Sequence, residues 1–106
     1  MPETTPPRLT VAMVVRNDAD ALSQSLRSIA AIADEMIVVD TGSTDNSREV
    51  AAQFGCQVIE FLWSDDFSAA RNAALPQITS DWILWLDAGE TLDEADATDL
   101  RRSITA

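Results

Sequence analysis

Four short apolar runs, rich in β-branched residues and placed at nearly regular intervals, constrain the fold more than any other feature. They cover residues 9–15, 36–40, 57–62 and 82–87, and their starts lie 21 to 27 residues apart. Each run is apolar with little alternation, which is typical of strands covered on both faces. The spacing leaves room for one helix between consecutive strands, so the sequence predicts β–α–β units and a mainly parallel sheet.

The segments between these runs have helical periodicity. The clearest apolar stripe is Leu22, Leu26, Ile29, Ala30 and Ala33, which share one face of a helix. Residues 46–55 and 67–78 predict two further helices, and a fourth helix is expected to begin with TLDE at residues 91–94. We therefore expect a doubly wound, Rossmann-like α/β layer with helices on both faces of the sheet.

The chain length of 106 residues fits one domain. Residues 1–8 are polar and proline-containing and are expected to be a flexible lead-in, so the α/β domain would cover residues 9–106. The sequence contains no apolar stretch near the ~20 residues of a membrane span and no secretion signal, which favours a cytoplasmic location. The single cysteine, Cys56, excludes an internal disulfide and is expected to be a small core residue.

The charge balance restricts the chemistry. The sequence has 18 acids, seven arginines, no lysine and no histidine, and its net charge is −11. This balance argues against nucleic acid as a partner. Residues 81–99 contain seven acids and no arginine, so an anionic ligand bound there would need a cation beside it. Without histidine, carboxylates must carry any acid–base or metal chemistry.

Polar residues follow the ends of the predicted strands. Arg16 and Asn17 come directly after Val15, Asp40 ends the second run, and Asp87 ends the fourth. Because ligands of doubly wound sheets bind outside the carboxyl ends of the strands, we expect these residues to meet at one edge. The turn TGSTD after Asp40 would bring backbone amides close to its carboxylate, which favours ligand binding; a purely structural role in the turn is the alternative.

Other polar residues have a simpler interpretation as helix caps. A capping box between Thr91 and Glu94 would close the start of the last helix and leave Asp87 and Glu90 free for a ligand or a metal ion. Arg71 lies within the alanine-rich helical segment, where ligand binding and a surface salt bridge are both open. The residues expected to act as N-terminal caps are Asp18, Thr44, Asp66 and Thr91.

Four ordered motifs carry a resemblance to a known family. The runs MVVRND, IVVDTGSTDNS, WSDDFSAARNAAL and SDWILWLDAGE, in this order and spacing, resemble the nucleotide-sugar-binding half of family 2 glycosyltransferases of the GT-A fold. The resemblance covers about residues 9–95. It implies an enzyme that transfers a sugar from a nucleoside diphosphate, often UDP, to an acceptor with inversion, using Mn²⁺ or Mg²⁺.

The resemblance also implies residue roles. Asp40 would contact the base, Arg71 would approach the base or the phosphates, and Asp87 would open the metal and ribose motif. Gly89 stands where the family usually has a second acid, so the remaining candidate metal ligands are Asp87 and Glu90. The implied nucleotide-binding residues are Val15, Arg16, Asn17, Asp40, Arg71 and Asp87.

Two other interpretations remain. The family's catalytic carboxylate lies in an acceptor-binding half that these 106 residues do not include, so the chain could instead be a non-catalytic nucleotide-binding or interaction remnant. An open sheet edge would then allow a homodimer or pairing with a second chain. The segment VVDTGS also matches the catalytic loop of dimeric aspartic proteases, which are all-β proteins, whereas the residues that follow it here have a helical pattern.

Overall fold

The sheet is four-stranded and entirely parallel. The computed structural model describes residues 8–61, 67–78, 80–87 and 89–105. Its strands are β1 (Leu9–Val15), β2 (Glu35–Asp40), β3 (Gln57–Glu60) and β4 (Trp82–Asp87), in the spatial order β3-β2-β1-β4. This confirms the predicted parallel sheet and gives β1 and β4 their predicted bounds. The third strand ends at Glu60, and Leu62 lies outside the described residues.

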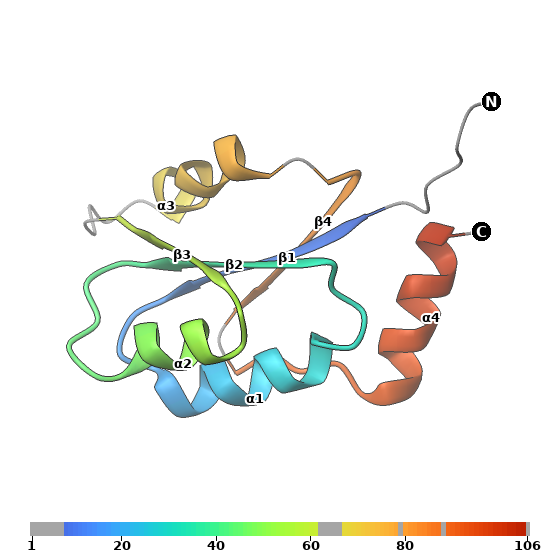
Figure 1. The fold of residues 1–106 in the computed structure, drawn as a ribbon, viewed down its shortest axis with the longest axis horizontal. Helices are drawn as coiled ribbons and strands as arrows, with labels where there is room; N and C mark the ends of the chain where they lie inside the picture. Colours follow the sequence, from blue (N-terminus) through green and yellow to red (C-terminus); the bar gives the residue numbers. More distant parts are fainter. Residues whose placement is uncertain (1–7, 62–66, 79, 88, 106) are drawn as a thin grey trace.

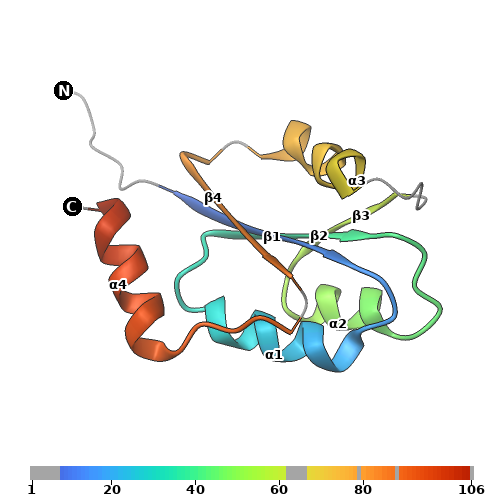
Figure 2. The same ribbon diagram turned by 180° about the vertical axis from the view of Figure 1, so that it is seen from behind.

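Helices cover both faces of the sheet, as Figures 1 and 2 show. Helices α1 (Ala19–Ile29) and α2 (Ser47–Gln53) pack on one face, and α3 (Phe67–Ala74) with the short 3-10 turn η1 (Leu75–Gln77) packs on the other. Helix α4 (Glu94–Thr105) stands beside the sheet near the amino ends of the strands. The doubly wound prediction is confirmed, and the all-β aspartic protease alternative is wrong.

The core lies in two layers, one on each face of the sheet. On the α1 face, Leu22, Leu26 and Ile29 are completely buried, which confirms the centre of the predicted stripe, although Ala30 is exposed. Each such side chain contributes about 1.5–3 kcal/mol relative to an exposed one. The α3 face uses smaller residues, with Ala70 of α3 packed in the cluster that contains Ile37 and Val39 of β2.

The amino end of the sheet is tied to the rest of the domain. Asp34 accepts hydrogen bonds from Leu9 N at 2.7 Å and from Arg101 Nη1 of α4 at 2.6 Å.

Cys56 is half-buried against the core of the α1 face, as expected of a small apolar residue, and burial raises the pKa of its thiol to about 11. No helix among the described residues is long and apolar enough to cross a membrane.

Candidate functional site

The strand order creates a topological switch point at the carboxyl edge. The chain runs outward from β1 to β2 and β3, and then crosses the sheet through α3 to place β4 on the other side of β1. In this arrangement ligands bind in the crevice outside the carboxyl ends. Val15 pairs with Asp40, and Val14 pairs with Asp87, so the two acids flank the end of β1 at one edge. Their backbones are two strand spacings, about 10 Å, apart.

The first strand ends in one buried and one exposed residue. Val15 is buried, and its carbonyl oxygen accepts hydrogen bonds from Thr41 N at 3.0 Å and from Thr41 Oγ1 at 3.1 Å. Arg16 follows at the edge and is exposed. The structure therefore fixes the backbone at Val15 to the loop after β2 and leaves the Arg16 side chain available at the edge.

Asp40 is the most buried acid of this edge, with 2% of its surface exposed. Its Oδ1 accepts hydrogen bonds from Gly42 N and Ser43 N, both at 2.9 Å. Its Oδ2 is buried and has no hydrogen-bond partner among the described residues. A buried polar atom without a partner costs about 1–3 kcal/mol, so the second oxygen is an acceptor held ready for a donor that the described residues do not supply.

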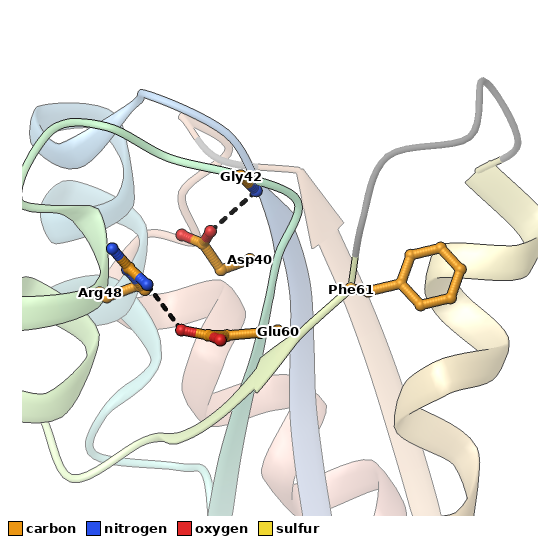
Figure 3. A pocket seen from close by; sticks show the side chains of 5 residues that line it. All are labelled: Asp40, Gly42, Arg48, Glu60 and Phe61. Atoms are coloured by element: carbon orange, nitrogen blue, oxygen red, sulfur yellow. Dashed lines mark hydrogen bonds and ion pairs between the residues drawn. The ribbon is translucent and has the colours of Figure 1, made fainter.

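A hollow of about 240 Å³ lies beside this carboxylate. Asp40 and Glu60 are paired in register at the ends of β2 and β3, and Arg48 enters from the first turn of α2. Arg48 Nη1 lies 2.6 Å from Glu60 Oε1, and Figure 3 shows this ion pair beside Asp40. The ring of Phe61 turns away toward α3, so Phe61 lines the hollow mainly with its backbone.

Sequence reasoning missed Arg48 and Glu60. Glu60 interrupts an apolar run near its end, much as Asp40 ends the preceding run, and that was an available signal. Arg48 had only a weak signal, a cation in the first turn of a helix, where the helix dipole disfavours positive charge. The neighbouring carboxylates, first Glu60 and then Asp40, raise the pKa of Arg48.

Asn17 joins the loop after β1 to the loop after β2. Its Oδ1 accepts hydrogen bonds from Thr44 N at 2.6 Å and Asp45 N at 3.2 Å, and its own N–H donates to Ser43 Oγ at 2.9 Å. Asn17 adopts a left-handed backbone with φ of 50°, which asparagine tolerates better than most residues. Thr44 therefore binds Asn17, and its predicted role as a helix cap is wrong.

Asp45 holds the first residue of two helices. Its Oδ1 accepts from Ser47 N at 2.9 Å and Ser47 Oγ at 2.6 Å, and its Oδ2 accepts from Ala19 N at 3.3 Å. The Ser47 hydroxyl is the main cause of the lowered pKa of Asp45. Asp18 occupies the predicted N-cap position of α1, but its side chain makes no capping hydrogen bond. Asp45, from the loop after β2, accepts from the first residue of this helix instead. Asp66 lies outside the described residues.

The turn after β4 carries the candidate metal ligands. Asp87 N donates to Glu90 Oε1 at 2.8 Å, and Glu90 N donates to the Asp87 carbonyl oxygen at 2.9 Å. Gly89 has φ of +99°, a conformation that favours glycine, and its N–H donates to Ser25 Oγ of α1. The turn therefore keeps the Asp87 and Glu90 carboxyl groups in one short segment, and both residues are exposed.

The predicted capping box at the start of α4 is wrong. The helix begins at Glu94, and the residue that caps it is Asp93, whose Oδ1 accepts from Asp96 N at 2.7 Å. Thr91 lies too early in the chain to act as the cap. Glu90 was expected to be free for a ligand. One of its carboxylate oxygens instead accepts a hydrogen bond from Asp87 N.

The donor set of this turn suits a cation that brings other ligands with it. Within the described ranges, no three acidic or cysteine side chains gather closely enough to hold a metal ion. Mg²⁺ is often held by only one or two carboxylates, with phosphate oxygens and water completing its shell. Asp87 and Glu90 could serve as the two carboxylates of such a site, with the oxygens of a diphosphate as further ligands.

Arg71 lies over Trp85 of β4, on the face of the sheet that carries Asp87 and not Asp40. Its guanidinium carbon lies 5.6 Å from the ring centroid of Trp85, within cation–π distance. Trp85 belongs to the core layer on the α3 face, and Asp87 follows it by two residues on the same strand, so alternation places both side chains on that face. By the same alternation Asp40 shares the α2 face with Val38. Among the described residues, Arg71 contacts this ring and forms no ion pair.

The parallel sheet, the switch point and the acids at its carboxyl edge together define a doubly wound α/β domain with a candidate ligand site at that edge. The sequence matches the model of glycosyl transferase family 2 over residues 10–104. The chain therefore belongs to this family, which confirms the resemblance found in the motifs.

The chain is also similar to individual proteins, one of which is named a glycosyltransferase. The chain is 42% identical over 97 residues to a TPR repeat-containing protein of Synechococcus elongatus, covering 92% of this chain and 24% of the relative. It is 32% identical over 87 residues to an uncharacterized glycosyltransferase of Rickettsia felis, covering 82% of this chain and 30% of that relative. The chain thus spans 24% and 30% of the length of these two relatives.

The fold also matches a solved glycosyltransferase. Glucosyl-3-phosphoglycerate synthase from Mycobacterium tuberculosis, in complex with UDP, superposes with a TM-score of 0.69 and 21% sequence identity. The match covers 79% of this chain and 34% of that chain. At this level of identity the similarity establishes the shared fold.

Proposed function

We propose that this chain binds the nucleoside-diphosphate portion of a sugar donor, with UDP as the nucleotide, for inverting sugar transfer to an acceptor. The donor would lie across the carboxyl edge, with its base at Asp40 and its diphosphate near Asp87. Val15, Arg16 and Asn17 would border the nucleoside where β1 ends.

The observation that carries the proposal is the buried Oδ2 of Asp40, which lines the hollow and has no hydrogen-bond partner in the described part of the chain. Backbone amides hold the other oxygen, so the carboxylate is already oriented before any ligand arrives. A ring N–H of a base is a suitable donor, and a hydrogen bond to an ionised group is stronger than one between neutral groups. A nucleoside would therefore remove the cost of leaving Oδ2 without a partner.

The diphosphate needs positive charge in this acidic protein, whose net charge is −11. Arg16 and Arg71 are candidate phosphate or base contacts, and Asp87 with Glu90 would hold Mn²⁺ or Mg²⁺. A divalent cation supplies Lewis-acid stabilisation of the charge that develops on the diphosphate leaving group. Support comes from the mycobacterial synthase of the same fold, which was solved with Mn²⁺ and UDP bound.

The second candidate is a module that binds the nucleotide without turnover. It is favoured by Gly89, which stands at the position of the second acid. Slow hydrolysis of a UDP-sugar in the presence of Mn²⁺ would support the enzyme, whereas nucleotide binding without hydrolysis would support the module. Both candidates share the same nucleotide site.

Thermal unfolding with a panel of nucleotides tests the shared site. UDP should raise the melting temperature, and more so with Mn²⁺, because a ligand at 100 times its Kd stabilises the folded state by about 2.7 kcal/mol. Asp40→Ala and the isosteric Asp40→Asn should abolish this shift. Asp99→Ala, which removes an exposed acid of α4, is the matched control and should keep it. If UDP, CDP, GDP and ADP all leave the melting temperature of the wild type unchanged, the proposed function is wrong.

A further inference from the structure

We propose that Arg48 and Glu60 are the specificity-determining pair of this site. In this proposal Arg48 donates a hydrogen bond to a carbonyl oxygen of the base, next to the ring N–H that Asp40 accepts. Glu60 holds the guanidinium in position. This inference rests on the proposed function and adds to it two residues and a rule for which bases bind.

The position of Arg48 is not explained by its own helix. It lies in the first turn of α2, where the helix dipole disfavours a cation, and its partner Glu60 comes from the end of β3. The side chains of this pair are 49% and 70% exposed, and ion pairs in such surroundings contribute little to stability. Removing the pair should therefore change the stability of the fold little, so variants of these two residues can be tested for another role.

The location of the Arg48–Glu60 pair indicates a role in ligand binding. Arg48, Glu60 and Asp40 line the same hollow, and Figure 3 shows the free oxygen of Asp40 on the side that faces Arg48. The guanidinium is close enough for the charge of Asp40 to contribute to its raised pKa, yet it bonds Glu60, and none of the described residues donates to Oδ2. A carboxylate with a buried acceptor oxygen and a cationic donor thus line the same hollow.

An acceptor beside a donor recognises a ring N–H beside a carbonyl group. Uracil has this edge, and so does guanine. Cytosine and adenine have a ring nitrogen that accepts, and such an atom placed at the same point would meet the lone pairs of Asp40 Oδ2. Glu60 keeps the planar guanidinium in one orientation, so that its N–H groups point consistently at the carbonyl oxygen.

The test measures Kd values of UDP, GDP and CDP by isothermal titration, with the full 106-residue chain and its variants. Arg48→Ala should weaken UDP binding about tenfold, as expected for one hydrogen bond to a charged group, and should change CDP binding by less than about twofold. Arg48→Lys and Glu60→Gln should lie between the wild type and Arg48→Ala, because each keeps part of the arrangement. Arg102→Ala removes an exposed arginine of α4 and is the matched control.

The outcomes separate this inference from the proposed function. If the wild type binds UDP and Arg48→Ala changes the Kd by less than about twofold, Arg48 does not contact the base and only this inference is wrong. Equal losses for UDP and CDP would show that Arg48 acts through its charge alone, which also overturns it. A wild type that binds no nucleotide contradicts the proposed function and this inference together.

GDP binding comparable to that of UDP would support the rule that a base with a ring N–H beside a carbonyl group binds. It would also show that the site accepts a purine that has this edge. Melting temperatures of Arg48→Ala and Arg102→Ala should agree, which excludes loss of folding as the cause.

Discussion

The two halves of the carboxyl edge are built differently. On the α2 face, Asp40 is almost completely buried, two backbone amides orient it, and the loop that follows it donates two backbone hydrogen bonds to Asn17 Oδ1. At the end of β4, Asp87 and Glu90 are exposed, and they share a turn that contains a glycine at positive φ. One half is thus arranged before a ligand binds, whereas the other offers carboxylates with few fixed partners.

This difference indicates how the two halves would contribute to donor binding. A preorganised acceptor gives selectivity because it loses little conformational freedom when the ligand arrives. Exposed carboxylates in a short turn bind a cation weakly until phosphate oxygens complete the coordination shell. We therefore expect the Asp40 side to set which nucleotide binds, and the Asp87 side to respond to the metal only when the nucleotide is present.

The largest effect is expected where the preorganised half is held together, at Asn17. Asn17→Ala removes the acceptor of two loop N–H groups and puts an alanine at φ of 50°, so we expect a loss of about 2–3 kcal/mol in the free energy of unfolding. Asn17→Gly removes the same acceptor without the backbone cost and should lose about 1 kcal/mol. Asn17→Asp keeps an acceptor and should stay near the wild type. Urea denaturation measures all three variants.

Equal losses for Asn17→Ala and Asn17→Gly would show that backbone strain is absent at this position. Nucleotide binding adds a second readout, because the loop that Asn17 holds also supplies the two amides that orient Asp40. If Asn17→Gly binds UDP as tightly as the wild type does, the Asp40 side does not depend on this link. The contrast between the two halves of the edge would then be smaller than the hydrogen bonds suggest.

The sequence predicted the parts of the fold that depend on local pattern. Continuous apolar runs identified all four strands, and two of them have the predicted bounds, because strands buried on both faces must be apolar along their length. The helix caps were predicted less well. Asp18, Thr44 and Thr91 had the right residue types before helices, but Asp45 bonds the first residue of α1 from a loop 26 residues away. Such a bond depends on how two loops pack and has no local signature.

The same distinction applies to the candidate site. Asp40 and Asp87 were found because an acid at the end of an apolar run is a local signal, and the parallel sheet brings their strands to one edge. Arg48 and Glu60 were missed because they meet only when α2 docks across β2 and β3. Glu90 was expected to be free, and the bond from Asp87 N could not be inferred before the shape of the turn was known.

An intermediate effect is expected at Gly89, in the exposed half. An added Cβ would meet only Ala21 Cβ at 3.6 Å, an ordinary contact, so the cost of Gly89→Ala comes from φ of +99° and should be about 1–2 kcal/mol in the free energy of unfolding. Gly89→Asp has the same backbone cost and adds the acid that the family usually has here. We expect it to enlarge the extra rise in melting temperature that Mn²⁺ gives in the presence of UDP.

Gly89→Ala is the matched control for that comparison, because it has the same backbone strain and no added carboxylate. If both variants show the same response to Mn²⁺, the turn after β4 does not bind the metal ion. A larger response from Gly89→Asp alone would show that the exposed half is limited by its number of carboxylate ligands.

The smallest effect is expected from acid titration of Asp45, which belongs to the preorganised half. Hydrogen bonds from Ser47, the hydroxyl first, hold the pKa of Asp45 below its ordinary value of 3.8, so the folded state binds its proton less readily than the unfolded state does. A group with a lowered pKa stabilises the fold fully above its unfolded pKa and loses this contribution as the pH falls through the folded pKa. Asp45→Asn should therefore be less stable than the wild type at neutral pH, and the difference should shrink below about pH 4. Urea denaturation of both proteins from neutral to acidic pH measures this convergence. A difference that stays constant over that range would show that the charge of Asp45 does not help to hold the two loops, and that geometry alone maintains the preorganised half.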